Sequence, residues 1–152
     1  MQSATNINKE VVMQDEKMLL GKINADGFQQ AEYKDWFNNS YTGYSLKPDV
    51  IEHLKDKLNG IQVKVFIGTW CSDSQREVPA FYKILDALEF DQQNLTMIGV
   101  DRSKEQPEEE LQAFEIEYVP TFIFYRNGEE IGRIIETPTL SLEEDILSIL
   151  SK

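Results

Sequence analysis

The feature that most constrains this chain is an apolar run, Val63–Ile67, that leads after a short break into a helical pattern. The run is β-branched and aromatic, which is typical of a strand buried on both faces. Between Val78 and Leu88, apolar residues recur at the three- and four-residue spacing of one helix face. A buried strand followed directly by an amphipathic helix predicts an α/β fold.

The only cysteine of the chain, Cys71, lies in the break between this strand and this helix. At a helix N-terminus, unpaired backbone N–H groups and the positive end of the helix dipole favour a thiolate over a thiol. Most lone cysteines are inert buried side chains, and that alternative stays open at this stage. The position favours a reactive sulfur.

The residues around Cys71 resemble a known active site. Trp70-Cys71-Ser72-Asp73-Ser74 resembles the Trp-Cys-x-x-Cys motif of the thioredoxin superfamily, with Ser74 in place of the second cysteine. Pro79 lies eight residues beyond Cys71, where members of that superfamily carry the proline that kinks the active-site helix.

Two later segments extend the resemblance, which covers about residues 61–152. Val119, Pro120 and Thr121 are similar to the cis-proline motif that faces the active-site cysteine, and residues 122–131 resemble the hairpin that follows it. The resemblance implies a thioredoxin-like fold, with a central mixed β-sheet flanked by helices.

The first part of the chain is expected to add an N-terminal helical extension, residues 1–45, packed on a domain formed by residues 46–152. Residues 1–16 are polar and are expected to be loosely attached, residues 17–23 suit a short strand, and residues 28–37 suit a helix. Three tyrosines lie in or near this extension: Tyr33, Tyr41 and Tyr44. Packing onto the domain is the favoured role for this cluster, ahead of a platform for carbohydrates or nucleobases.

Beyond the central helix, residues 95–100 form a second buried strand, so the strand–helix–strand order predicts a parallel pair. Asp101 and Arg102 follow this strand; they could reach a ligand, although a loop or capping role is favoured. Asn127-Gly128 between two apolar runs predicts a hairpin, and residues 141–150 predict a closing helix.

The resemblance implies thiol–disulfide exchange, in which Cys71 would supply the attacking thiolate. A dithiol enzyme releases its substrate with a second thiol. Ser74 cannot do so, because a hydroxyl is neither acidic enough nor reactive enough toward sulfur. Ser74 could instead donate a hydrogen bond to the thiolate, or simply cap the helix. Val65 and Met97 stand where thioredoxins place a buried carboxylate and its lysine partner, which assist the resolving cysteine.

The resemblance also implies which residues would surround the sulfur: Trp70, Ser72, Asp73, Val119, Pro120, Thr121, Ile135 and Glu136. Asp73 stands where thioredoxins often have proline, and Glu136 stands at a position that is usually glycine. Two carboxylates near the sulfur predict slower attack on acidic disulfides than on basic ones.

The sequence therefore predicts a monothiol exchange protein, whose mixed disulfide on Cys71 is resolved by an external thiol. Its partners would be protein or low-molecular-weight disulfides and thiols, with neither a cofactor nor a metal. The alternative is a non-catalytic binding or chaperone-like module that keeps the same groove. An iron–sulfur monothiol glutaredoxin is disfavoured, because that group has glycine and phenylalanine where Ser72 and Asp73 stand.

Charge and targeting signals limit the partners further. The net charge of −12 argues against nucleic acid and against anionic membrane surfaces. A single cysteine excludes an intramolecular disulfide. The N-terminus lacks a basic segment followed by an apolar one, which predicts a soluble cytoplasmic protein. A secreted protein that has lost its signal peptide would read the same way, and the sequence carries no signal for an oligomeric state.

Overall fold

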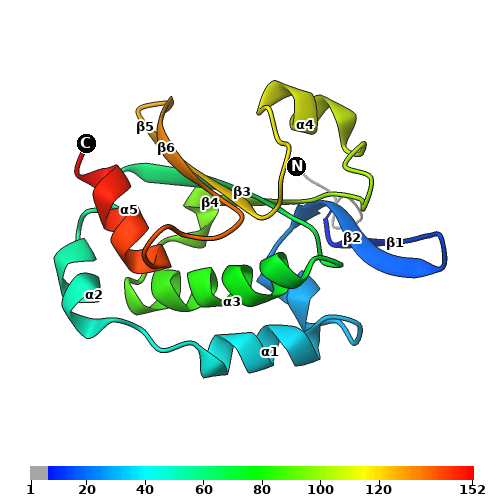
Figure 1. Cartoon of the computed structure of the whole chain (residues 1–152), viewed down its shortest axis with the longest axis horizontal. Coiled ribbons are helices and arrows are strands. Elements are labelled where there is room, and N and C mark those ends of the chain that lie inside the picture. The colour runs from blue at the N-terminus through cyan, green and yellow to red at the C-terminus, as the bar shows by residue number, and fades with distance from the viewer. Residues whose placement is uncertain (1–6) are drawn as a thin grey trace.

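The computed structural model describes residues 7–152 and is built around a six-stranded mixed sheet (Figure 1). The strands are β1 (Lys9–Met13), β2 (Glu16–Ile23), β3 (Ile61–Ile67), β4 (Leu95–Gly99), β5 (Thr121–Arg126) and β6 (Glu129–Ile135). They lie across the sheet in the order β1-β2-β4-β3-β5-β6. The expected parallel pair is β3 with β4, and every other neighbouring pair is antiparallel.

Helices cover both faces of this sheet, which confirms the predicted α/β architecture (Figure 1). They are α1 (Lys34–Gly43), α2 (Pro48–Leu54), α3 (Ser72–Ala87), α4 (Glu108–Ala113) and α5 (Leu142–Leu150), with short 3-10 segments at Ala25–Gln29 and Gln92–Asn94. Helix α4 lies on one side, and α1, α2, α3 and α5 lie on the other. Within residues 7–152, no helix is long and apolar enough to cross a bilayer.

Strand β3 is buried on both faces, as its sequence predicts. Val65 points into the larger apolar core, which it shares with α1, α3 and α5. Phe66 points into a smaller core on the other face, formed with β4, β5 and the α4 region. Both side chains have no exposed surface. Because alternate residues of a strand face opposite sides, one continuous apolar run fills both cores.

The N-terminal segment contributes strands to the sheet as well as a helix. The expectation that residues 1–16 are loosely attached is wrong for Lys9–Met13, which forms β1; residues 1–6 lie outside the described part. The expected short strand is β2, which pairs with β1 on one side and with β4 on the other. The side chains of β1 are mostly exposed, so backbone pairing rather than apolar burial holds it in place. For that reason its sequence shows no alternating pattern.

Tyrosine–carboxylate hydrogen bonds join parts of this segment to one another and attach it to the rest of the molecule. The Tyr33 hydroxyl lies 2.8 Å from Glu10 on β1, and the Tyr41 hydroxyl lies 2.6 Å from Asp86 on α3. The Tyr44 hydroxyl donates to the fully buried carboxylate of Glu143 on α5. The three tyrosines therefore have packing roles.

The C-terminal half follows the sequence closely. The hairpin β5–β6 turns at Asn127 and Gly128, whose φ angles of 54° and 81° are both positive, as a tight two-residue turn requires. The closing helix α5 begins after Ser141, whose hydroxyl accepts a hydrogen bond from the Glu144 N–H as an N-cap. The predicted hairpin and helix are both confirmed.

Candidate functional site

Cys71 is the N-cap residue of α3 and lies just beyond the end of β3. Its N–H donates to the Gly68 carbonyl at 2.9 Å, and its carbonyl accepts the first helical bond, from the Gln75 N–H. The side chain is partly exposed. Its Sγ lies 3.6 Å from the carbonyl oxygen of Val119, to which the thiol donates. The Val119–Pro120 peptide bond is cis. The fold thus brings Cys71 and the Val119-Pro120 segment together over 48 residues of sequence.

Trp70 is fixed from two sides. Its indole Nε1–H donates to the Val100 carbonyl at 2.9 Å, which ties it to the end of β4. Its ring also lies against Gly68, so closely that a Cβ at Gly68 would stand 2.6 Å from the indole Cε2. Only glycine fits there without displacing the ring.

Ser74 is fully buried, and its hydroxyl oxygen accepts a hydrogen bond from the Gly68 N–H at 3.2 Å. Neither bond expected from the sequence, to the Cys71 sulfur or to the helix N-terminus as a cap, is present within residues 7–152. The side chain therefore holds the turn that carries Cys71, instead of acting on the sulfur directly.

Asp73 does not stand near the sulfur as an unpaired charge. Its carboxylate lies 2.9 Å from Arg76 Nη2, and Arg76 Nε lies 2.8 Å from Glu77. Hydrogen bonds to Glu77 and then to Asp73 raise the pKa of Arg76. Because Arg76 offsets the Asp73 charge, Asp73 opposes a thiolate less than the sequence suggests. Its neighbour Ser72, the first residue of α3, is exposed.

The segment after β6 lies next to the cis proline. The Glu136 N–H donates to the Pro120 carbonyl at 2.7 Å, while Thr121 Oγ1 donates to the Tyr118 carbonyl at 2.6 Å. Ile135 is half-exposed. Glu136 has φ = +63°, in the left-handed region that favours glycine. The backbone at this position thus keeps a conformation suited to glycine although the side chain is glutamate.

Val65 and Met97 are direct partners across the parallel strands β3 and β4. Both are buried in the larger core, with 0% and 2% of their surfaces exposed. No proton acceptor or donor is offered by either side chain. The positions that the resemblance associates with proton transfer are therefore part of the apolar core.

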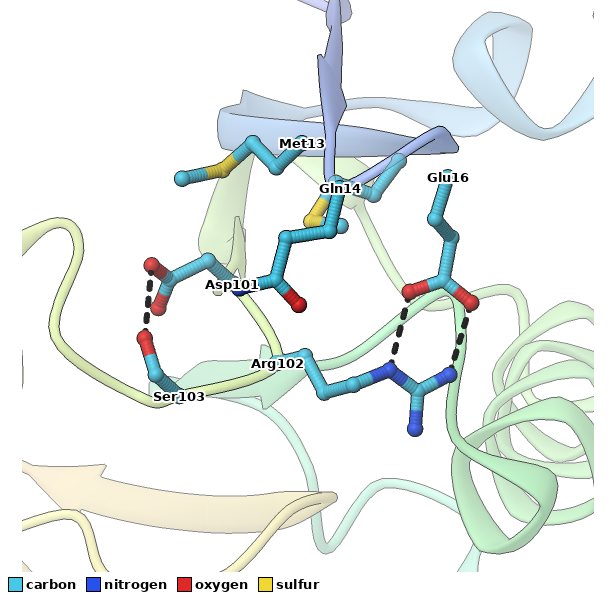
Figure 2. Close-up of a pocket in the computed structure, with 7 residues that line it drawn as sticks. Met13, Gln14, Glu16, Asp101, Arg102 and Ser103 are labelled. Atoms are coloured by element: carbon cyan, nitrogen blue, oxygen red, sulfur yellow. Dashed lines mark hydrogen bonds and ion pairs between the residues drawn. The ribbon is translucent and has the colours of Figure 1, made fainter.

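Two neighbours of the site stand out only in the structure: Arg102, for which the sequence favoured a loop or capping role over contact with a ligand, and Tyr118, which the sequence did not single out. The Arg102 guanidinium carbon lies 5.0 Å from the centre of the Trp70 ring, and Arg102 forms a two-pronged ion pair with Glu16 on β2 (Figure 2). Tyr118 is half-exposed and directly precedes Val119. A sequence signal did exist for Arg102, because β3 and β4 are parallel and their carboxyl ends meet at one edge of the sheet.

The assembled site places a partly exposed thiol at a helix N-terminus, beside aromatic and apolar surface. Trp70 and Cys71 both pack against the smaller core, and Tyr118 and Ile135 are exposed, the first directly before Val119 and the second at the end of β6.

Comparisons with known proteins agree with this geometry. A family model described as thioredoxin matches residues 25–144. A thioredoxin of Geodia cydonium is 30% identical over 90 residues, which are 59% of this chain and 79% of that protein. A thioredoxin-like protein of Acanthamoeba polyphaga mimivirus is 26% identical over 94 residues, 62% of this chain; the match spans 66% of the viral protein, just under two thirds of its length.

Among solved structures, a protein of unknown function from Pseudomonas aeruginosa superposes with a TM-score of 0.54 and 15% identity, over 80% of this chain and 85% of that one. At this identity the likeness concerns the fold alone. The family match, in contrast, covers well over half of the sequence, including β3, Cys71, α3 and Pro120. The chain belongs to the thioredoxin family.

Proposed function

We propose that this protein is a monothiol thiol–disulfide exchange protein that acts through Cys71. One observation carries the proposal: the only sulfhydryl of the chain is partly exposed at the N-cap of α3, with its Sγ 3.6 Å from the carbonyl that precedes Pro120. A thioredoxin-family chain is expected to work on disulfides and thiols, and this is where such a substrate would meet a sulfur.

The reaction has two balanced steps. The Cys71 thiolate attacks one sulfur of a disulfide R–S–S–R′, forming Cys71–S–S–R while R′–S⁻ leaves and takes a proton from water. An external thiol then attacks the Cys71 mixed disulfide. It forms a new disulfide with R and returns Cys71 to the thiol.

The surroundings of Cys71 support an external resolving thiol. Ser74 is buried against the Gly68 N–H, and its hydroxyl cannot displace a thiolate. Val65 and Met97 leave no titratable group beneath the site that would assist a resolving residue. The mixed disulfide should therefore persist until another thiol arrives, whether from a protein or from a small molecule.

Intact-mass spectrometry tests the proposal. The protein is challenged with oxidised glutathione and with a peptide disulfide, and it should gain one adduct of each that only added thiol removes. Cys71→Ser is the control, and it should gain none. Absence of any adduct across about pH 6–9, a range that brackets the ordinary thiol pKa, would overturn the exchange function if a denaturing titration shows a free thiol. That result would favour a non-catalytic binding module, in which the same groove holds a partner without reaction.

A further inference from the structure

Two cations lie over aromatic side chains of the site, those of Trp70 and Tyr118. Arg102 lies over Trp70, the residue before Cys71, at 5.0 Å from the ring centre. Lys104 lies over Tyr118, with its Nζ at 5.9 Å from that ring centre. Tyr118 in turn precedes the residue whose carbonyl meets the cysteine sulfur. The two cations therefore lie on the residue before Cys71 and on the residue before its carbonyl partner, in a chain whose net charge is −12.

The loop that carries both cations is cross-linked by hydrogen bonds to Asp101, which is 3% exposed. Its carboxylate accepts hydrogen bonds from the N–H groups of Glu105 and Gln106, at 2.8 and 3.1 Å, and from the Ser103 hydroxyl. Its carbonyl accepts a further bond from the Lys104 N–H. The two cations are thus presented from a fixed backbone, which lowers the entropic cost of binding an anion.

Arg102 already has an ion-pair partner, Glu16, which another carboxylate could displace. Its Nε and Nη2 lie 2.9 and 2.7 Å from the two carboxylate oxygens of Glu16, and no partner for Nη1 is found in residues 7–152 (Figure 2). More than half of the Arg102 side chain and about a third of the Glu16 side chain are exposed. Exposed ion pairs contribute little net free energy. A substrate carboxylate can therefore take the place of Glu16, or bind at the free edge of the guanidinium.

A cavity of about 200 Å³ lies next to this ion pair. Its walls combine two methionine side chains with polar groups: Met13, Gln14, Glu16, Met18, Asp101, Arg102 and Ser103. Figure 2 shows the Gln14, Glu16 and Arg102 side chains gathered around it. Its size suits a small substituent, and Arg102 belongs both to this cavity and to the surface of Trp70.

We infer that the preferred disulfide substrates carry a carboxylate close to the reacting sulfur, with Arg102 as its main binding residue and Lys104 as a second one. The inference rests on the proposed exchange at Cys71. It is opposite to the expectation, drawn from Asp73 and Glu136, that acidic disulfides react slowly. Arg76 offsets Asp73, and Arg102 and Lys104 were not included in that expectation.

The test compares two disulfides of matched shape, 3,3′-dithiodipropionate and its neutral diamide. The rate of adduct formation on Cys71 is followed by intact-mass spectrometry, and the ratio of the two rates is the readout. The wild-type protein should favour the carboxylate. Arg102→Gln should reduce the ratio about 3–10-fold, and added salt should reduce it as well. Lys55→Gln removes an exposed cation at the C-cap of α2 and should leave the ratio unchanged.

A second variant acts in the opposite direction. Glu16→Gln releases Arg102 from its ion pair, so the ratio should rise above the wild-type value. Ratios that are equal in the wild type, Arg102→Gln and Glu16→Gln, both for the small disulfides and for the peptide pair described below, would overturn the inference while leaving exchange at Cys71 intact. Failure of both disulfides to react would instead overturn the proposed function.

Peptide disulfides separate the two sources of a carboxylate. Two cystine-linked peptides that differ only by Asp or Asn next to the cysteine are compared in the same assay. A preference confined to the Asp peptide identifies an acidic protein segment as the substrate, and a preference already present in the small disulfides identifies a small acidic thiol. Absence of a preference in both pairs would overturn the inference.

Discussion

At the scale of single residues, Gly68 connects the backbone to the site. Its N–H binds Ser74, its carbonyl binds the Cys71 N–H, and its missing side chain leaves room for the Trp70 ring. The sequence shows this glycine only as a break after an apolar run. The contact that requires glycine comes from a side chain two residues away, and a hydropathy pattern does not report such contacts.

Gly68→Ala tests this role. The added Cβ would stand 2.6 Å from the indole, so Trp70 must move and lose its bond to the Val100 carbonyl. We expect the free energy of unfolding to fall by about 1–3 kcal/mol, as for other over-packed positions, measured by urea denaturation followed by circular dichroism.

Gly43→Ala is the matched control. Gly43 ends α1, and a Cβ there would meet no atom within 4 Å. Alanine should be neutral or stabilising by up to about 1 kcal/mol. Similar losses of stability in both variants would show that the space beside Trp70 is not the reason for glycine at position 68.

At the scale of elements, the first turn of α3 decides what happens after Cys71 has reacted. Ser74→Cys should supply a resolving sulfur, so that the adduct with oxidised glutathione becomes transient and an internal disulfide between positions 71 and 74 follows. The step should still be slow, because Val65 and Met97 offer no proton acceptor. Mass spectra taken over time, with and without alkylation, measure both species.

Ser74→Ala distinguishes a role of Ser74 in resolving the adduct from a role in stabilising this turn. Its adduct should last as long as that of the wild type, whereas its free energy of unfolding should fall by about 1–3 kcal/mol, because the Gly68 N–H loses its buried acceptor. The assigned role of position 74 would be contradicted if the Cys71 adduct of Ser74→Cys lasts, although alkylation before the challenge shows that both thiols are accessible.

Elements defined by their own sequence were predictable, and those defined by distant partners were not. The strand–helix–strand unit, the hairpin at Asn127 and the last helix each carry a local pattern, and each is present. Strand β1 was missed because its exposed side chains leave no periodic signal. At the site, Cys71 and Pro120 were predicted neighbours. The position of Arg102 over Trp70 depends on the register of β4 beside β3 and on the loop fixed by Asp101.

At the scale of the whole molecule, tyrosine–carboxylate bonds join the N-terminal segment to α3 and α5, and they should make stability sensitive to alkali. The hydrogen bond to Asp86 and burial raise the pKa of Tyr41 to about 12. Burial, together with the bonds to Glu10 and Glu143, raises the pKa values of Tyr33 and Tyr44. These groups stay protonated longer in the folded protein than in the unfolded chain.

The contribution of these tyrosines to the free energy of unfolding should therefore be complete below the unfolded tyrosine pKa of about 10. It should fall as the pH rises from there through about 12. Thermal melts across this range, read beside tyrosinate absorbance, should show unfolding together with ionisation. Tyr41→Phe should lessen the alkaline loss. Ionisation of every tyrosine near pH 10 with an unchanged circular dichroism spectrum would contradict this expectation.

The place of β2 in the sheet also governs when this protein can complete its fold during synthesis. Strand β2 is made early, yet one of its two edges pairs only with β4, which follows long after it in the chain. At translation rates of about 5–20 residues per second, the apolar side chains of Met18 and Leu19 wait on the order of 4–15 seconds for that partner. During that interval the nascent hairpin has an unpaired edge beside apolar side chains. Chaperones bind surfaces of this kind, and two nascent chains on the same messenger RNA can pair through them.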